Sequence, residues 1–360
     1  MKIDAIQITN FRNIREAILE FHPQVNWIVG KNGSGKTSLL EALYCLGSSR
    51  SFRTNNYNQL VNFDSNGLNI YAQIRNDTHK KINIGIQILD KLRRIRVDHE
   101  EIRTASSLAE HLAIQVITPN QSRLIEDGPR YRRKFMDWGL FHVEHRFKSD
   151  WSRMTKILKQ RNANLKVAQH YEDIKHWDLE YLEVSESIRE ARTKYTVELF
   201  SHVENYISEL RGFLPVSFEL YNGWPNGKTL AECIQEHYVL DKKRGVTQYG
   251  PHKSDLRIKT QNHLFREIAS RGQIKLLATI LKLSQLDHLS AQVERGAILM
   301  IDDLASEFDP MNQRRIFDWA LSTKTQIFLT CTDVETKKML DPHSKYKMFH
   351  VEHGAFKEVL

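Results

Sequence analysis

A glycine-rich octapeptide near the N-terminus has the residue types needed to hold a chain of phosphates. Residues 30–37 fit the pattern G-x-x-x-x-G-K-[ST], the Walker A motif or P-loop. Glycines let backbone N–H groups turn towards a phosphate, Lys36 offers charge to the β- and γ-phosphates, and the Thr37 hydroxyl can bind Mg²⁺. We therefore predict that a nucleoside triphosphate binds through Gly30, Lys31, Asn32, Gly33, Ser34, Gly35, Lys36 and Thr37.

The segments on either side of this loop place it at the start of a helix. Val25–Val29 is an apolar run of strand length, and residues 38–44 carry apolar side chains at helical spacing. The dipole and the unpaired N–H groups of a helix N-terminus favour an anion. The alternative is a chance glycine-rich turn, but a match with both flanks is expected in fewer than about one chain in a hundred.

A second group of residues, far along the chain, can supply the partner for the metal. The apolar run 297–301 has the composition of a buried parallel strand and ends at Asp302 and Asp303. An apolar strand with a carboxylate at its tip is a Walker B element. We predict that Asp302 holds Mg²⁺ together with Thr37, and that Lys36 and Asp303 are catalytic, with Asp303 polarising the attacking water. A strand followed by an acidic helix cap is the alternative, which the P-loop disfavours.

Composition bounds the partners and the compartment. The 360 residues are 41% hydrophobic and carry a net charge of +8, which favours nucleic acid over a membrane surface as a polyanionic partner. A merely basic enzyme is the alternative. No apolar run approaches the roughly 20 residues of a membrane span, so we expect no membrane partner. Cys45, Cys233 and Cys331 are too far apart in sequence for a disulfide framework or a metal site, which predicts a cytoplasmic protein.

The first third of the chain has the pattern of an α/β half. Residues 3–8 and 17–21 are predicted strands joined by a turn, and residues 68–74, 81–89 and 92–97 are predicted antiparallel strands. Arg12 lies in the first turn, where its guanidinium could reach the bound nucleotide. A solvated surface arginine is the alternative for Arg12.

The middle of the chain is predicted to be helical. One helical stretch runs from Pro129 to about residue 165 and a second from about 174 to 210, giving an antiparallel hairpin about 60 Å long at 1.5 Å per residue. The basic cluster 130–134 is either a DNA-contacting stripe or a solvated helix face. We predict an ATPase lobe from 1–118 and 246–360, interrupted by a helical lobe at 119–245. The two parts of the ATPase lobe should share one sheet, because the P-loop and Walker B must meet.

Two further stretches resemble motifs of ABC-type ATPases. Ser270-Arg271-Gly272-Gln273, before Walker B, resembles their signature motif, and Ser306-Glu307-Phe308-Asp309, after it, resembles their D-loop, with Ser306 and Asp309 as its polar residues. A serine hydroxyl and glycine N–H groups at a helix N-terminus form a second phosphate cradle. In ABC-type ATPases that cradle serves the ATP of the partner subunit, so the nucleotide lies between two protomers.

The whole chain resembles the RecF family of bacterial recombination and gap-repair ATPases, which is related to the SMC proteins. The resemblance implies an α/β, ABC-type, SMC-like head with a second, mainly helical lobe and a short helical hairpin. It further implies ATP and Mg²⁺ as cofactors, an ATP-dependent homodimer on single- or double-stranded, gapped DNA, and slow hydrolysis. Work with RecO and RecR to place RecA, and a link to the SOS response, are also implied. The motifs that carry the resemblance are the P-loop, Asn10-Phe11-Arg12-Asn13, Ser51-Phe52-Arg53-Thr54, Gly128-Pro129 with Arg132-Arg133, Gly250-Pro251-His252-Lys253-Ser254-Asp255, Ser270-Arg271-Gly272-Gln273 and Ile301-Asp302-Asp303.

Departures from the wider ABC pattern leave alternatives open. The acidic pair is Asp-Asp where transport ATPases carry Asp-Glu, and no switch histidine follows the strand at 326–329. Asn120 or Gln121 is the best match to a glutamine loop. A clamp in which ATP is chiefly a glue and hydrolysis is incidental remains an alternative. A transporter ATPase subunit is disfavoured by the long helical insertion, and an SMC cohesion ATPase by the short hairpin.

Overall fold

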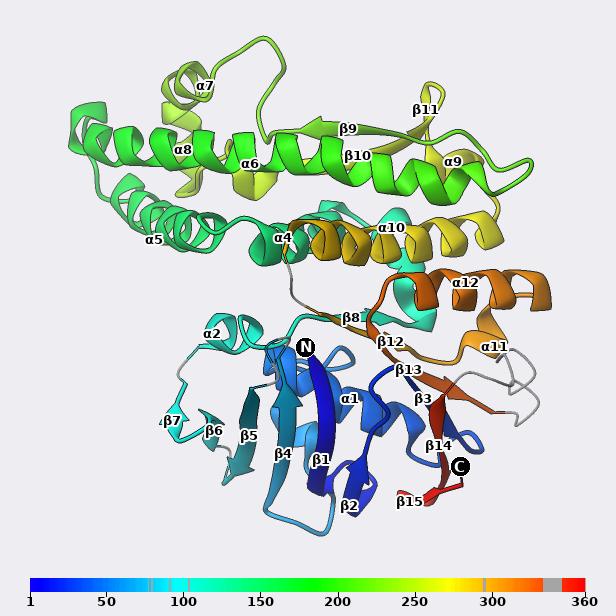
Figure 1. The fold of residues 1–360 in the computed structure, drawn as a ribbon. Helices are drawn as coiled ribbons and strands as arrows, with labels where there is room; N and C mark the ends of the chain where they lie inside the picture. Colours follow the sequence, from blue (N-terminus) through cyan, green and yellow to red (C-terminus); the bar gives the residue numbers. More distant parts are fainter. Residues whose placement is uncertain are drawn as a thin grey trace. The chain divides into compact units, whose positions relative to one another are not determined.

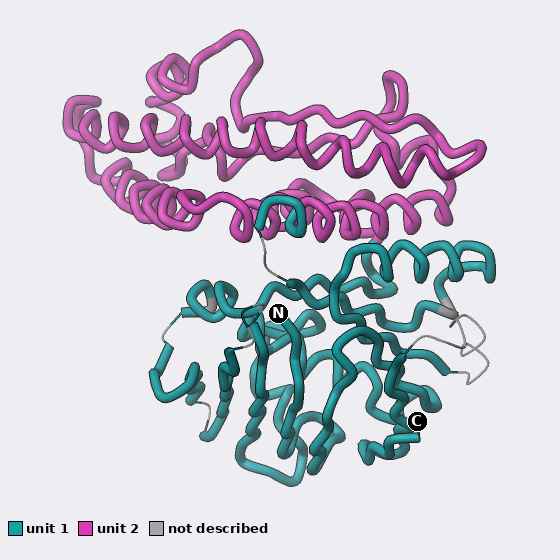
Figure 2. The backbone as a smooth tube through the Cα atoms, in the orientation of Figure 1, with its two compact units in different colours: residues 1–121, 289–360 teal, residues 122–288 magenta. Residues whose placement is uncertain are grey.

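The computed structural model describes residues 1–76, 78, 80–90, 92–102, 104–293, 296–332 and 345–359. These residues form two compact units: unit 1 comprises 1–121 and 289–360, and unit 2 comprises 122–288 (Figure 2). The sequence-based division assigned 246–288 to the ATPase lobe, whereas its packing groups this stretch with unit 2. The reason is that a strand at residues 255–260 is hydrogen-bonded to a strand at residues 217–221, which lies within the predicted helical lobe.

The first sheet of unit 1 is antiparallel, in the order β2-β1-β4-β5-β6-β7 (Figure 1). Its strands alternate in hydrophobicity because one face is buried and the other is exposed. In β5, for example, Ile84, Ile86 and Ile88 are buried while Gln87 is exposed. The predicted strands are confirmed as β1 (Lys2–Phe11), β2 (Ile14–Glu20), β4 (Gly67–Arg75), β5 (Lys81–Leu89) and β6 (Leu92–Val97), with a short β7 (Glu100–Glu101) at the edge.

The second sheet of unit 1 brings the two ends of the chain together. Its order is β15-β14-β3-β13-β12-β8, and all neighbouring pairs are parallel except β14 with β15. Every residue of β3, β12 and β13 is buried, which explains why these strands are continuous apolar runs. The expectation that N- and C-terminal segments share a sheet is confirmed. The strands are β3 (Val25–Val29), β8 (Ile114–Ile117), β12 (Ile298–Ile301), β13 (Gln326–Cys331), β14 (Tyr346–Glu352) and β15 (Ala355–Glu358).

One hydrophobic core joins the two sheets of unit 1 through α1 (Lys36–Ser48). Leu39, Leu40, Leu43 and Leu46 of this helix are fully buried against apolar side chains of both sheets. The helix that follows the P-loop is therefore held rigidly, and so is the loop itself. The other helical elements of unit 1 are η1 (Tyr57–Leu60), α2 (Ala105–Ala109), η2 (Pro119–Ser122, which ends at the boundary), α11 (Leu304–Glu307) and α12 (Pro310–Ser322).

Unit 2 is mainly helical, but its hairpin differs from the predicted one. The first helical stretch is two helices, α4 (Pro129–Val143) and α5 (Phe147–Leu165), because Glu144 takes up an extended conformation. The second stretch is one helix, α6 (Lys175–Ser208), which packs antiparallel to α5 (Figure 1). At 1.5 Å per residue, the 19 residues of α5 span roughly 28 Å and the 34 residues of α6 roughly 51 Å. The 60 Å hairpin was therefore an overestimate.

A three-stranded sheet in the order β11-β10-β9 completes unit 2. Its strand β9 (Ser217–Tyr221) was not predicted, and it pairs antiparallel with β10 (Asp255–Thr260). The short β11 (His263–Leu264) is followed by α10 (Arg271–Gln292), which continues past the boundary between the units. The remaining elements are α3 (Arg123–Glu126), η3 (Tyr171–Asp173), α7 (Leu230–Glu236), α8 (Tyr238–Arg244), η4 (Pro251–Lys253) and α9 (Phe265–Ile268).

Across the described ranges, every helix is either too short or too polar to cross a bilayer.

Candidate nucleotide-binding site

The P-loop connects β3 to α1, as its flanks predicted. Gly33 and Gly35 have φ values of +79° and +122°, a region that side chains other than glycine's rarely adopt. A Cβ atom on Gly30 would lie only 2.4 Å from the Val351 carbonyl oxygen and 2.8 Å from Ser34 Oγ. These three glycines are therefore required by the backbone path of the loop, which is the path that turns N–H groups inward.

Lys36 lies at the start of α1 and holds its ammonium group inside the loop. Its Nζ donates to the carbonyl oxygens of Gly30 at 2.7 Å and Lys31 at 3.0 Å. Burial lowers the pKa of Lys36, while the nearby carboxylates of Asp303 and Asp302 act in the opposite direction. The lysine therefore rests on weak carbonyl acceptors, which an incoming phosphate can replace.

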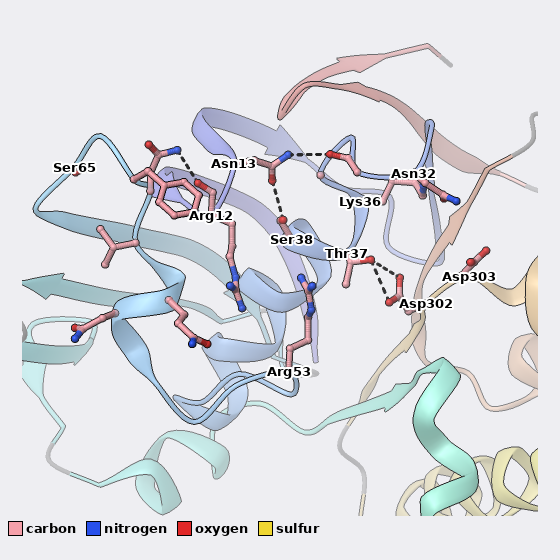
Figure 3. A pocket seen from close by; sticks show the side chains of 17 residues that line it. Arg12, Asn13, Asn32, Lys36, Thr37, Ser38, Arg53, Ser65, Asp302 and Asp303 are labelled. Carbon is pink, nitrogen blue, oxygen red and sulfur yellow. Dashed lines mark hydrogen bonds between the residues drawn. The ribbon is translucent and has the colours of Figure 1, made fainter.

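Thr37 and Asp302 join the P-loop to Walker B, as predicted. Thr37 Oγ1 lies 3.0 and 3.2 Å from the two carboxylate oxygens of Asp302 (Figure 3). Thr330 Oγ1 donates to Asp302 Oδ1 at 2.8 Å. Burial raises the pKa of Asp302, and the hydrogen bonds from Thr330 and Thr37 oppose that shift. A hydroxyl and a carboxylate in contact are the hard oxygen donors that Mg²⁺ prefers, so these residues fit the metal.

Ser34 supplies an independent sign that the loop is built for an anion. Its Oγ is buried and has no hydrogen-bond partner among the described residues. Buried hydroxyl groups are ordinarily paired, because leaving one unpaired costs free energy. A phosphate oxygen in the loop would satisfy this hydroxyl, so the residues present fit a nucleoside triphosphate.

Asp303 adopts a left-handed backbone conformation, with φ 57° and ψ 52°. Its N–H donates to Thr330 Oγ1 at 2.8 Å, so one threonine holds both acidic residues of the pair. Non-glycine residues in this region are strained and are often found at functional sites. In this conformation Asp303 lines the wall of the cavity described next, beside Asp302.

A cavity of about 710 Å³ lies over the P-loop within unit 1. This volume is within the range of small-ligand sites. In Figure 3, Lys36, Thr37 and Asp302 lie on one side of the cavity and Ser65 on the other. The lining combines P-loop and Walker B residues with a distant segment: Arg12, Asn13, Asn32, Gly33, Gly35, Lys36, Thr37, Ser38, Arg53, Asn58, Gln59, Val61, Asn62, Phe63, Ser65, Asp302 and Asp303.

Arg12 lines this cavity, but its guanidinium is held by a partner that the sequence did not suggest. Its Nε and Nη2 donate to the two carboxylate oxygens of Glu41 at 2.9 and 2.8 Å. The Glu41 side chain is fully buried, and Arg53 Nη1 lies 3.6 Å from it. Arg53, from the motif Ser51-Phe52-Arg53-Thr54, therefore also reaches the cavity. A charged residue on the apolar side of α1 was the signal that could have revealed Glu41.

Asn13 belongs to the motif Asn10-Phe11-Arg12-Asn13, but the sequence did not predict its role at the P-loop. Its Nδ2 donates to the Ser34 carbonyl oxygen at 3.1 Å, and its Oδ1 accepts from Ser38 Oγ at 2.8 Å. The N–H of Gly354, in the turn between β14 and β15, donates to the same Ser34 carbonyl at 2.7 Å. The P-loop is thus braced by the β1–β2 turn and by the C-terminal hairpin.

The signature-like residues lie in unit 2, at the exposed start of α10. Ser270 Oγ accepts the N–H of Gln273 at 3.3 Å, and Gln273 Oε1 accepts the N–H of Ser270 at 3.0 Å. This reciprocal pair is a capping box. Ser270, Arg271 and Gly272 are exposed, so the N-terminal end of α10 is open to solvent.

The D-loop-like residues have a separate local structure in unit 1. Asp309 caps α12, accepting the N–H of Asn312 at 3.0 Å. The side chain of Ser306 lies outside the described residues. Asn120 and Gln121, the glutamine-loop candidates, are in η2 and do not appear among the described residues that line the cavity.

Two residues of the basic cluster at the start of α4, Arg132 and Arg133, make contacts inside unit 2. For these two residues, neither the DNA-contacting stripe nor the solvated helix face is correct. Arg132 forms a bidentate ion pair with Asp255, at 2.7 and 3.1 Å, and Arg133 donates to the Ser254 carbonyl oxygen at 2.7 Å. Arg192 of α6 donates to the Pro251 carbonyl oxygen at 2.7 Å. The motif at 250–255 is therefore clamped by arginines. Within the cluster, Arg130 and Lys134 have exposed side chains.

Comparison with known proteins agrees with this geometry. The family described as RecF/RecN/SMC N terminal domain matches residues 2–357. A DNA replication and repair protein RecF from Haemophilus ducreyi is 35% identical over 99% of this chain and 100% of its own length. The chain belongs to the RecF family. The RecF protein of Haemophilus influenzae is 36% identical over 98% of both chains.

The fold of the RecF family is also seen in solved structures. A structure described as the recombination mediator protein RecF-ATP in the RecFOR pathway has a TM-score of 0.88 and 24% identity, covering 100% of this chain and 98% of that one. The expected ABC-type, SMC-like head with its helical lobe is therefore confirmed.

Proposed function

We propose that this RecF-family chain is an ATP-dependent DNA-binding protein of recombinational gap repair and replication-fork maintenance. The observation that carries the proposal is the contact between Thr37 and Asp302, which joins a P-loop to a Walker B carboxylate at one cavity. The relatives named above are DNA replication and repair proteins, and one neighbour is described with ATP. The protein would act in the cytoplasm.

The residues around the cavity have distinct roles in this proposal. Backbone N–H groups of residues 30–37 and the Lys36 ammonium bind the phosphates, and Thr37 and Asp302 hold Mg²⁺. The metal, when bound, would neutralise charge on the β- and γ-phosphate oxygens. Asp303 orients and polarises the attacking water, and Arg12 and Arg53, which line the same cavity, add positive charge at the nucleotide. The short side chain of Asp303 is consistent with slow hydrolysis.

ATP binding would be coupled to dimerisation. Ser270, Arg271, Gly272 and Gln273 of one protomer would contact the γ-phosphate held by its partner, with Ser306 and Asp309 near the same interface. Two chains would close over two ATP molecules and hold single- or double-stranded DNA near a gap. The net charge of +8 supports a DNA partner. RecR and RecO are the expected protein partners, with RecA and the SOS response reached indirectly.

In a second candidate function the same site binds ATP, but the bound ATP serves chiefly to hold the two protomers together. It is favoured by the Asp-Asp pair, because an aspartate reaches less far than the glutamate of faster ATPases. In that case the dimer would recruit partners, and hydrolysis would be incidental to the function.

Two substitutions test the proposal. Lys36→Ala should abolish ATP binding and ATP-driven dimerisation, whereas Asp303→Asn should bind ATP normally and prolong the dimer. Equilibrium binding of ATP and sedimentation with and without ATP measure both. Normal ATP-driven dimerisation of the Lys36 variant would contradict the proposal. Full gap-repair activity of the Asp303 variant would favour the second candidate function, in which hydrolysis is incidental.

A further inference from the structure

A second cavity belongs to unit 2, and its lining shares no residue with that of the nucleotide cavity. Its volume is about 340 Å³, which is within the range of small-ligand sites. Its walls come from α3, the start of α4, β10 and residues 264–266. Two of these stretches carry parts of the motifs at 128–133 and 250–255, to which the proposed nucleotide chemistry assigns no role.

The lining of this cavity has an excess of positive charge. It contains three arginines and a single carboxylate, that of Asp255. This carboxylate is already neutralised, because Arg132 binds both of its oxygens, at 2.7 and 3.1 Å. The charges of Arg257 and Arg266 remain, so the cavity attracts an anion.

The two remaining arginines differ in how they are held. Arg257 donates to Glu219 Oε1 at 2.8 Å and lies over the ring of Tyr221, 5.0 Å from its centroid, so its position is fixed. Arg266 is exposed, and its Nη1 donates to the Glu126 carbonyl oxygen at 3.1 Å. Among the described residues no carboxylate offsets the charge of Arg266. This guanidinium is therefore available to an anionic group from outside the chain.

The uncharged part of the lining is apolar and consists of Gly128 and the side chains of Ile125, Pro129, Ile258 and Leu264. A phosphate group of DNA would contact the arginines but would leave these apolar side chains uncovered. A peptide with a carboxylate side chain next to an aliphatic one covers both kinds of wall. Its carboxylate pairs with a guanidinium while its aliphatic side chain is removed from water. Clusters of arginines recognise acidic motifs in other proteins in this way.

We propose that this cavity of unit 2 is a docking site for an acidic, apolar peptide segment of a partner protein. Arg266 pairs with a carboxylate of the segment, Arg257 adds to the attraction, and the apolar walls take an adjacent aliphatic side chain. The site goes beyond the proposed ATP and DNA function. It does not depend on bound nucleotide, because its lining residues belong to unit 2.

The test uses three fluorescein-labelled five-residue peptides and the full-length protein without ATP. The first alternates glutamate and leucine, the second has glutamine in place of glutamate, and the third has serine in place of leucine. Fluorescence polarisation should show that the first peptide binds about tenfold or more tightly than either of the others.

Two variants locate the binding. Arg266→Gln should weaken binding of the glutamate–leucine peptide about tenfold and remove its advantage over the glutamine peptide. Arg211→Gln, which removes an exposed arginine of unit 2 outside the cavity lining, is the matched control and should leave both affinities unchanged.

Three results would overturn the assignment. The first is equal binding of the glutamate–leucine and glutamine–leucine peptides by the wild type. The second is an unchanged affinity of Arg266→Gln for the glutamate–leucine peptide. The third is absence of peptide binding by the wild type together with loss of gapped-DNA binding or of ATP-driven dimerisation in Arg266→Gln. That result would assign the arginine to DNA or to a second copy of the chain. Failure of the proposed nucleotide site would leave this test intact, because no ATP is added.

Discussion

Arg12 and Glu41 form a bidentate ion pair on the wall of the nucleotide cavity. The glutamate is fully buried on the helix that follows the P-loop, and the arginine comes from the turn between β1 and β2. The pair ties the first sheet to the P-loop helix and sets the direction of a guanidinium at the cavity. It therefore links the stability of unit 1 to the shape of its site.

Removing Arg12 should destabilise the protein more than removing both partners. Arg12→Ala leaves the buried Glu41 carboxylate without its main partner, so we expect the free energy of unfolding to fall by about 3 kcal/mol. The double variant with Glu41→Gln should recover part of that loss, because the uncompensated charge is gone. Urea unfolding of wild type, Arg12→Ala, Glu41→Gln and the double variant measures this cycle.

Arg15→Ala is the matched control for that cycle. Arg15 pairs with Asp64 at 3.0 Å, but both side chains are largely exposed, so its removal should change stability little. Equal stabilities of Arg12→Ala and wild type would mean that the buried pair does not hold the helix.

Replacing Asp302 should uncouple ATP binding from magnesium. Asp302→Asn keeps a side chain of similar shape and can still contact Thr37, but it loses the negative charge that attracts the cation. We expect the strengthening of ATP binding by Mg²⁺ to fall roughly tenfold or more. Titration of ATP with and without Mg²⁺ measures it.

Asp303→Asn is the control for the Asp302 experiment and should retain the magnesium effect. If Asp302→Asn bound ATP with the magnesium dependence of the wild type, Asp302 would not be a metal ligand.

His252 should make unit 2 less stable in mild acid. Burial, with the nearby charges of Lys253, Arg133 and Arg161, lowers the pKa of His252 to about 4. Its Nε2–H donates to the Thr247 carbonyl oxygen at 3.1 Å, and its Nδ1 lies 3.1 Å from the Tyr181 hydroxyl. The unfolded chain binds a proton at this histidine below its ordinary pKa of 6.5, whereas the folded chain does so only near 4.

The sign of the effect follows from that difference. The stability that neutral His252 allows is fully present above pH 6.5 and is lost as the pH falls towards 4, by on the order of 3 kcal/mol. Thermal unfolding of wild type and His252→Gln between pH 7 and pH 4.5 tests it. The variant should show a flatter pH profile, and parallel profiles would rule out this histidine as the source.

The parts of the site that lie along one short stretch were predictable from the sequence. The strand, loop and helix around residues 25–48, and the strand before Asp302, follow from local spacing and residue type. Such local patterns specify both the element and the position of the chemistry at its end.

The parts that depend on distant pairing were not predictable. Glu41 meets Arg12, and Asn13 meets Ser34, only because two strands and a helix fold together. Strand β9 alternates weakly and is half-exposed, so its pairing with β10 decides its conformation. The break between α4 and α5 falls at Glu144, where neither glycine nor proline marks it. Arg132 was expected to face solvent or DNA, but its buried guanidinium is satisfied by Asp255 and by the carbonyl oxygens of Ile125 and Asp127.

We propose that the ATP-binding site of one protomer is completed by the signature-like turn of another. Sedimentation velocity of the full-length protein with and without MgATP tests it, using Ser270→Tyr to fill the exposed start of α10. Ser201→Tyr, at an exposed serine of α6, is the matched control. We predict that wild type and Ser201→Tyr form dimers only with MgATP, while Ser270→Tyr binds ATP and stays monomeric. ATP-driven dimers of Ser270→Tyr equal to those of wild type would contradict the account.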